Sequence, residues 1–255
     1  MPDIYESEVF VQYYDLAPIY NDRSDAAFYL VRAKEARGPV LELGCGSGRV
    51  LVPIAREGIE ITGFDASPAM LKQCQAKLCE ANLGAETILG DMRHFDLGRK
   101  FALITIPFRP FLHLLDPPDQ IACLDCVRRH LAPGGRFIFD VFDPRLDILA
   151  SENRLAALEY EFTGPQGHSM QRSARRVRHD RARQVIHMEL IFTDKQTGVQ
   201  QTMPLVMRYC FRYELEHLLD RCGFEVIEVL GDFDGSPVGD VCKELIFTSI
   251  VSSSQ

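Results

Sequence analysis

The sequence has no apolar run that approaches ~18 residues, so no segment is expected to cross a membrane as a helix. It has no excess of positive charge either. Its formal net charge is −8 at pH 7, which disfavours generic binding of nucleic acid. The N-terminal residues are acidic and aromatic, not basic and then apolar, and so do not resemble a signal peptide.

Paired cysteine motifs are also scarce. Of the eight cysteines, only Cys123 and Cys126 form a C-x-x-C motif, and a zinc site of this kind needs a second pair. The residues around them have a helical pattern, so we expect no metal site. Scattered thiols in a chain without a secretion signal indicate a reducing, cytoplasmic setting.

The length of 255 residues fits one α/β domain, or one such domain with an insertion. Short β-type runs alternate with helical spacing in the first half, which is typical of a parallel sheet with crossover helices. The expected strands are 40–43, 60–64, 86–89, 101–106 and 136–141, and the expected helices are 49–57, 68–82 and 118–131.

The pattern changes near Leu146. Apolar residues alternate with others in 186–192 and again in 205–213, which is typical of half-buried antiparallel strands. We expect an inserted three-stranded antiparallel subdomain over 146–210, with 1–145 and 211–255 forming the main domain. The C-terminal part returns to the first pattern, with a helix at 214–222 and strands at 224–230 and 244–251.

Three glycines at every second position follow the first expected strand, in Glu42-Leu43-Gly44-Cys45-Gly46-Ser47-Gly48. Glycine tolerates positive φ and lets a ligand approach the backbone. The N–H groups of this loop, which precedes a helix, are therefore predicted to face a small polar ligand. The spacing argues against two common ligands. A P-loop needs Gly-Lys-Ser/Thr, and the dinucleotide fingerprint needs glycine where Arg49 stands.

Four further motifs follow in order. Asp65 ends the second expected strand, and Gly90-Asp91-Met92-Arg93 follows the third. Segment 104–114 leads from the fourth strand into a loop, and 131–138 turns into the fifth through Pro-Gly-Gly. Together with the glycine loop, this series resembles the motifs of the class I S-adenosylmethionine-dependent methyltransferases. The resemblance continues through 214–234 and so covers nearly the whole chain.

This resemblance implies an α/β fold with a doubly wound, seven-stranded, mostly parallel sheet in the order 3-2-1-4-5-7-6, the last strand antiparallel. It implies S-adenosyl-L-methionine as cofactor and S-adenosyl-L-homocysteine as product. Asp65 would accept both ribose hydroxyls, because a carboxylate offers two acceptor oxygens in one plane. Asp91 would accept from the adenine N6 amine, and Met92 would pack on the ring. The implied cofactor-binding residues are Tyr20, Glu42, Gly44, Cys45, Gly46, Gly48, Asp65, Ala66, Asp91, Met92 and Ile106.

The acceptor site is marked by a second resemblance. Residues 14–16 and 108–114 look like segments of the sugar-amine N-methyltransferases, a small-molecule branch with a similar inserted sheet. By that resemblance Tyr14 and His113 would lie near the acceptor as the catalytic residues, and His113 could take a proton near neutral pH. Phe108 and Arg109 would contact the acceptor. Arg109 could pair with an anionic group, or it could be a solvated loop residue.

Each of these residues also has a purely structural alternative. Asp65 and Asp91 could cap a helix or a turn. Glu42 could form an ion pair at a strand end. Tyr20 could be a core residue, and His113 could pack at the start of a helix. The three glycines could form a tight turn that binds no ligand.

The function expected from the sequence is methyl transfer to N or O of a small-molecule acceptor. One alternative is an RNA methyltransferase that uses the six arginines between Arg172 and Arg183, although the negative total charge argues against it. Another is a methyltransferase-like binding module without turnover. An NAD-dependent enzyme is the least favoured. The inserted sheet could be a lid or the interface of a homodimer.

Overall fold

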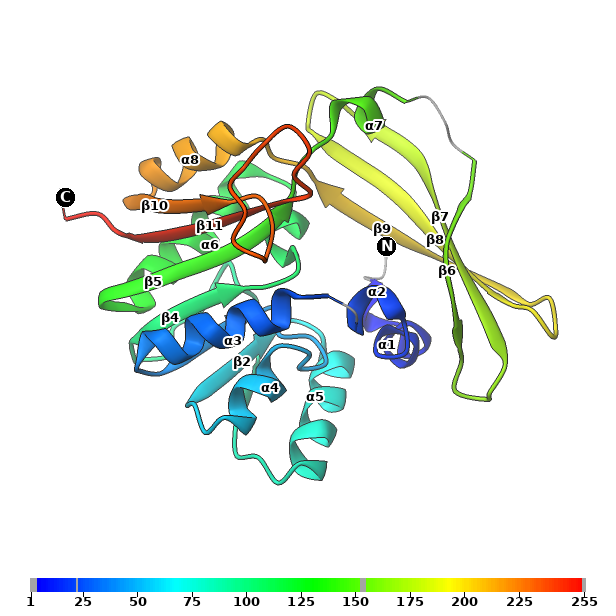
Figure 1. The fold of residues 1–255 in the computed structure, drawn as a ribbon, viewed down its shortest axis with the longest axis horizontal. Helices are drawn as coiled ribbons and strands as arrows, with labels where there is room; N and C mark the ends of the chain where they lie inside the picture. The colour runs from blue at the N-terminus through cyan, green and yellow to red at the C-terminus, as the bar shows by residue number, and fades with distance from the viewer. Residues whose placement is uncertain (1–3, 22, 152–154, 254–255) are drawn as a thin grey trace. The chain divides into compact units, whose positions relative to one another are not determined.

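The computed structural model describes residues 4–21, 23–151 and 155–253 (Figure 1). The chain forms two compact units. The main unit consists of Ser24–Pro144 and Cys210–Gln255, and the second unit consists of Met1–Arg23 and Arg145–Tyr209. The second unit therefore joins the N-terminal segment to the region that the sequence marked as an insertion.

A seven-stranded sheet forms the centre of the main unit, in the order β10-β11-β5-β4-β1-β2-β3. Strands β1 to β5 pair in parallel, and β11 runs antiparallel to both of its neighbours. The predicted order and the antiparallel last strand are confirmed. The strands are β1 Val40–Leu43, β2 Ile61–Asp65, β3 Glu86–Leu89, β4 Phe101–Ile106, β5 Leu131–Phe142, β10 Phe224–Leu230 and β11 Glu244–Val251.

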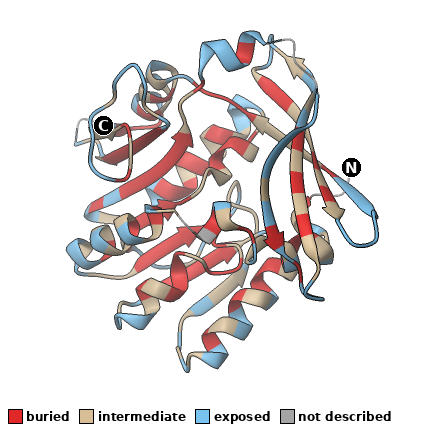
Figure 2. Ribbon diagram, turned by 45° about the vertical axis from the view of Figure 1, so that its right-hand side comes forward, coloured by how far each residue is buried: buried red, intermediate tan, exposed pale blue. Residues whose placement is uncertain are grey.

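Helices cover this sheet and bury its central strands (Figure 2). One core contains Tyr29 and Ala33 of α3 together with apolar residues of α4, α5 and the central strands. Helix α6 packs against β5, and α8 packs against β10. The helices of the main unit are α3 Asp25–Ala36, α4 Leu51–Arg56, α5 Pro68–Glu80, α6 Pro117–His130 and α8 Arg212–Arg221, with a 3₁₀ turn η2 at Pro110–His113.

Two predicted strands differ most from the structure, β5 in the main unit and β9 in the second unit. Strand β5 begins at Leu131, before the predicted residue 136. The strand predicted for 205–213 ends at Arg208 as β9, because α8 begins at Arg212. A capping interaction sets that start, since the Phe211 N–H donates to Glu214 Oε2 at 3.2 Å. The sequence alternates between apolar and other residues beyond Arg208, but the capping interaction at Phe211 starts a helix there.

The second unit contains a four-stranded antiparallel sheet in the order β6-β7-β8-β9. The prediction of three strands was wrong. The additional strand β6 exposes most of its residues and buries only Phe162, so it shows no clear alternation. In β8 the predicted apolar face is confirmed by the burial of Ile186, Leu190 and Phe192. The strands are β6 Ala157–Thr163, β7 Ser169–Asp180, β8 Val185–Asp194 and β9 Gln200–Arg208.

The N-terminal segment packs on this second sheet through aromatic rings. Phe10 lies 6.2 Å from Phe192, and Tyr13 lies 5.6 Å from Phe162, measured between ring centroids. The short helical elements of the unit are η1 Ile4–Glu6, α1 Glu8–Tyr14, α2 Pro18–Asn21 and α7 Leu146–Ala150. Across residues 4–21, 23–151 and 155–253, no helix combines the length and apolar character needed to cross a membrane.

Candidate functional site

The glycine loop connects β1 to α4, and all three glycines have positive φ, between +53° and +83°. A Cβ built on Gly44 would lie 2.7 Å from Pro110 Cβ, and one on Gly48 would lie 2.7 Å from Cys74 Sγ. A Cβ on Gly46 would have nothing within 4 Å. Close packing therefore explains two of the glycines. Gly46 borders open space, where a ligand can approach the backbone.

Asp65 holds this loop from the end of β2. Its Oδ2 accepts from the Gly46 N–H at 2.7 Å, and its Oδ1 accepts from the Ser67 N–H at 2.8 Å. Ser67 in turn caps α5, because its Oγ accepts from the Met70 N–H at 3.1 Å. Each oxygen of a carboxylate can accept more than one hydrogen bond. Asp65 therefore orients the loop from the end of β2.

A cavity of about 220 Å³ opens beside Asp65. Six of the predicted site residues line it: Gly44, Asp65, Ala66, Asp91, Met92 and His113. Six residues that we did not assign to the site line it too: Phe64, Gly90, Arg93, Pro110, Leu114 and Asp119. Predicted residues of the main unit that do not line this cavity are Glu42, Cys45, Gly46, Gly48, Ile106, Phe108 and Arg109.

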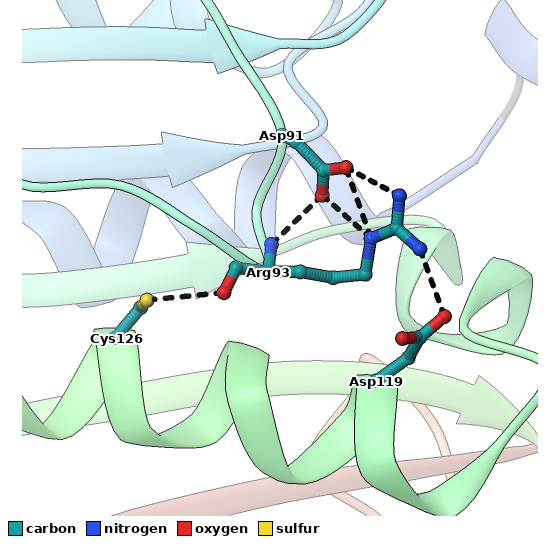
Figure 3. A network of polar contacts seen from close by, with 4 residues as sticks. All are labelled: Asp91, Arg93, Asp119 and Cys126. Carbon is teal, nitrogen blue, oxygen red and sulfur yellow. Dashed lines mark hydrogen bonds and ion pairs between the residues drawn. The ribbon is translucent and has the colours of Figure 1, made fainter.

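Asp91 is held by a hydrogen-bond network (Figure 3). Its Oδ1 accepts from the backbone N–H of Arg93 at 2.9 Å, and its Oδ2 accepts from Arg93 Nη2 at 2.5 Å. Arg93 Nη1 donates to Asp119 Oδ2 at 2.9 Å, which ties this turn to the start of α6. The hydrogen bonds from Arg93 lower the pKa of Asp91. The Asp91 carboxylate therefore remains an ionised acceptor at the cavity wall.

Replacing Arg93 by alanine is expected to weaken binding of S-adenosylhomocysteine about threefold or more, because Asp91 loses the group that orients it. Stability should fall by less than about 1 kcal/mol, because the ion pairs of Arg93 are partly exposed. Isothermal titration and thermal unfolding measure the two effects. Arg128→Ala, which removes an exposed i,i+3 ion pair with Asp125 on α6, is the matched control. Equal affinities in the two variants would contradict this role for Arg93.

Glu42 lies at the end of β1 and is 2% exposed. Within the described part of the chain its Oε2 has no hydrogen-bond partner. Burial raises the pKa of Glu42 well above its ordinary value. A raised pKa favours the neutral form of this carboxyl, so its burial gives no argument for a positively charged ligand. A buried carboxyl oxygen without a partner costs free energy, which a hydrogen-bond donor would offset.

The segment after β4 carries the two predicted acceptor contacts Phe108 and Arg109. Arg109 Nη2 lies 2.5 Å from Glu244 Oε1, and the guanidinium also lies over the Phe142 ring at 5.4 Å. Arg49 lies over the Phe108 ring at 5.0 Å. Arg109 is therefore paired inside the protein, and an anionic acceptor would have to share it with Glu244.

The predicted aromatic residues Tyr14 and Tyr20 lie in the second unit. Their rings stack with centroids 4.0 Å apart and an angle of 15° between the planes. Tyr20 is 6% exposed, and Tyr14 also contacts the edge of Phe10 at 5.8 Å. The structure thus brings these two predicted residues together in one aromatic pair.

Asp140 on β5 is a buried acidic residue that our sequence analysis did not single out. Its Oδ1 accepts from the Tyr29 hydroxyl at 2.7 Å and from the Phe108 N–H at 2.8 Å. Burial, assisted by the charge of Glu244, raises its pKa from 3.8 to about 6, while Tyr29, the Phe108 N–H and Arg109 act in the opposite direction. No motif marked Asp140, because its partners are distant in sequence.

This raised pKa predicts a pH-dependent stability. A carboxyl whose pKa is higher in the folded than in the unfolded state adds stability that is fully present below about pH 4. That stability is lost as the pH rises through about 6, the folded-state pKa. The melting temperature of the wild type should therefore rise relative to that of Asp140→Asn when the pH is lowered from about 7.5 to about 5. A difference that stays constant over this range would contradict the titration of Asp140.

Known methyltransferases resemble this chain in the region that contains the cavity. The family model "Methyltransferase domain" matches residues 40–135, which include the glycine loop, Asp65 and Asp91. A dTDP-3-amino-3,4,6-trideoxy-alpha-D-glucopyranose N,N-dimethyltransferase of Streptomyces venezuelae is 30% identical over 134 residues, which are 52% of this chain and 53% of that protein. This match spans about half of each chain.

Solved structures extend the similarity to nearly the full length. The CcbJ methyltransferase of Streptomyces caelestis is 27% identical, with a TM-score of 0.78 over 92% of this chain and 97% of that one. CalS10 of Micromonospora echinaspora, an amino pentose methyltransferase with bound S-adenosylmethionine, has a TM-score of 0.68, 23% identity and 90% coverage of both chains. Residues 40–135 therefore match the methyltransferase family, and over nearly its whole length the chain has the fold of the class I S-adenosylmethionine-dependent methyltransferases.

Proposed function

We propose that the protein methylates a nitrogen or oxygen of a small molecule, and that an amino sugar is the favoured acceptor class. The observation that supports the proposal is that Asp65, Asp91 and His113 line one cavity, since the proposed donor contacts and the proposed base would then act in the same space. The similarity to the sugar N,N-dimethyltransferase of Streptomyces venezuelae supports the acceptor class.

The residues of the main unit fit the donor. Asp65 offers acceptor oxygens for the ribose hydroxyls, and Asp91 and Met92 lie in the same cavity for the adenine. The open space at Gly46 admits a ligand against the backbone. Glu42 at the end of β1, whose Oε2 lacks a partner in the described structure, is a further proposed donor contact that acts by hydrogen bonding. When bound, S-adenosylmethionine supplies an activated methyl group.

Little further chemistry is needed from the protein. Methyl transfer from a sulfonium is an in-line displacement, and alignment of the reactants can lower the barrier by up to ~7–11 kcal/mol. A general base adds ~10²–10⁴-fold in rate. His113 on η2 is the proposed base that takes the proton of the acceptor. Phe108 and Arg109 are the proposed acceptor contacts in the main unit.

The pairing of the arginines in the second unit argues against an RNA methyltransferase. Arg172 pairs with Glu159, Arg175 with Glu189, and Arg178 with Asp180. Arg176 donates to the backbone carbonyls of α7, including Ile148 O at 3.0 Å. Several of the six arginines between Arg172 and Arg183 therefore pair with groups of their own unit, which leaves less positive charge for a phosphate backbone.

Incubation with methyl-labelled S-adenosylmethionine tests the acceptor class. The test compounds are nucleotide-linked amino sugars, the same sugars with hydroxyl in place of the amine, free amino acids, and transfer RNA. We expect label on the amino sugars and a loss of labelling in His113→Ala with donor binding retained. Label on transfer RNA alone would contradict the proposal. Donor binding without any labelled product, across the panel and a metabolite extract, would favour a binding module.

A further inference from the structure

The turn after β4 contains two consecutive residues in the left-handed backbone region. Phe108 has φ 65° and Arg109 has φ 73°. For a residue with a Cβ this conformation costs roughly 1–2 kcal/mol. Strained residues of this kind persist only where neighbouring groups hold them. The question is therefore which groups hold this turn, and what the turn positions.

Asp140 is the main contact of the turn. The side chain is completely buried, and its Oδ1 accepts from the Phe108 N–H at 2.8 Å. The same oxygen accepts from the hydroxyl of Tyr29 on α3, at 2.7 Å, and Tyr29 is completely buried as well. Hydrogen bonds to a charged group contribute about 1.5–3 kcal/mol, which is enough to offset the strain at Phe108.

The other Asp140 oxygen shows that this arrangement is not optimal for stability alone. Oδ2 is buried and has no hydrogen-bond partner within the described part of the chain. A buried polar atom without a partner costs about 1–3 kcal/mol. An apolar side chain that fills the same volume would avoid this cost, but it would leave the Phe108 N–H without its acceptor.

The turn leads directly into the site. Pro110 follows Arg109 and packs on Gly44, because a Cβ built on Gly44 would lie 2.7 Å from Pro110 Cβ. Pro110 and His113 both line the cavity that contains Asp65. A change in the backbone at Phe108 would therefore move residues at the cavity wall and against the glycine loop.

We propose that Asp140 is a positioning residue for methyl transfer, which holds the Phe108–Arg109 turn in its left-handed form and so sets Pro110 and His113 against the donor site. The proposal rests on the proposed function, because it concerns the same cavity. Asp140 does not contact the cavity itself and acts through the Phe108 N–H. Arg109, paired with Glu244 at 2.5 Å, secures the second residue of the turn.

A double-mutant cycle between Asp140→Ala and Phe108→Gly tests this role, with affinity for S-adenosylhomocysteine as the readout. Glycine adopts positive φ without the Cβ penalty, so it needs less support from Asp140. We expect Asp140→Ala alone to weaken binding about tenfold. In the Phe108→Gly background the same change should weaken binding less than threefold. Asp140→Asn keeps an acceptor oxygen and should stay within threefold of the wild type.

Ser249→Ala is the matched control, because it removes a buried polar group of β11 and should lower the melting temperature without changing affinity. A stability loss in Asp140→Ala with unchanged affinity would overturn the proposal. So would a tenfold loss in both backgrounds. If Asp140→Ala alone does not fold, the double variant decides. The proposal requires the double variant to fold and to bind within threefold of Phe108→Gly, and any other result overturns it. Failure of the wild type to bind would instead contradict the proposed function.

Discussion

Replacing Asp65 by alanine is expected to weaken binding of S-adenosylhomocysteine at least tenfold. The substitution removes the acceptor of the ribose hydroxyls and also the acceptor of the Gly46 N–H, at 2.7 Å. Hydrogen bonds to a charged group contribute about 1.5–3 kcal/mol, and about 1.4 kcal/mol corresponds to a tenfold change in affinity. The loss of one ribose contact is thus sufficient for the expected effect.

Isothermal titration measures this effect directly. Asp65→Asn keeps a neutral acceptor oxygen and should lose less affinity than alanine, which separates hydrogen bonding from charge. Asp220→Ala, at an exposed position on α8, is the control and should bind like the wild type. An affinity of Asp65→Ala within twofold of the wild type would show that the assignment of the ribose to Asp65 is wrong.

The second large effect is expected at Gly46. Gly46 and Gly58 both have positive φ, 53° and 73°, and a Cβ built on either would have nothing within 4 Å. Alanine should therefore cost a similar ~1–2 kcal/mol of backbone strain at each position. At Gly46 alone, the methyl group would occupy space that a ligand needs. We expect Gly46→Ala to lose at least tenfold in affinity for S-adenosylhomocysteine.

This pair of variants separates ligand contact from folding. Thermal unfolding should show similar decreases for Gly46→Ala and Gly58→Ala, whereas titration should show a loss of affinity only for the first. The glycine at 58 follows α4 and is exposed, so its substitution reports strain without a ligand. Equal affinities for the two variants would mean that Gly46 is needed only for the turn.

The sheet of the main unit could be predicted from the sequence because its signals are local. The strand ends carry glycine or aspartate at fixed places, and the family motifs imply the strand order that the structure shows. The same locality explains why Gly44, Asp65 and Asp91 were found. Asp65 ends its strand, while Gly44 and Asp91 come within two residues after theirs, and the carboxyl ends of parallel strands meet at one edge of the sheet.

The parts that could not be predicted depend on contacts distant in sequence. Asp140 is 111 residues from Tyr29, and no spacing rule connects them. Asp119 reaches Arg93 across 26 residues only because α6 begins beside the turn at 90–93. Strand β6 was missed for a different reason, because it buries a single side chain and so lacks alternation.

The most direct measurement is a crystal structure of the protein with S-adenosylhomocysteine bound. We expect the nucleoside in the cavity of about 220 Å³, with both ribose hydroxyls within hydrogen-bond distance of Asp65 and the adenine beside Met92. Density for the ligand elsewhere, or its absence from crystals grown at saturating ligand, would contradict the placement of the donor at the carboxyl ends of β1, β2 and β3.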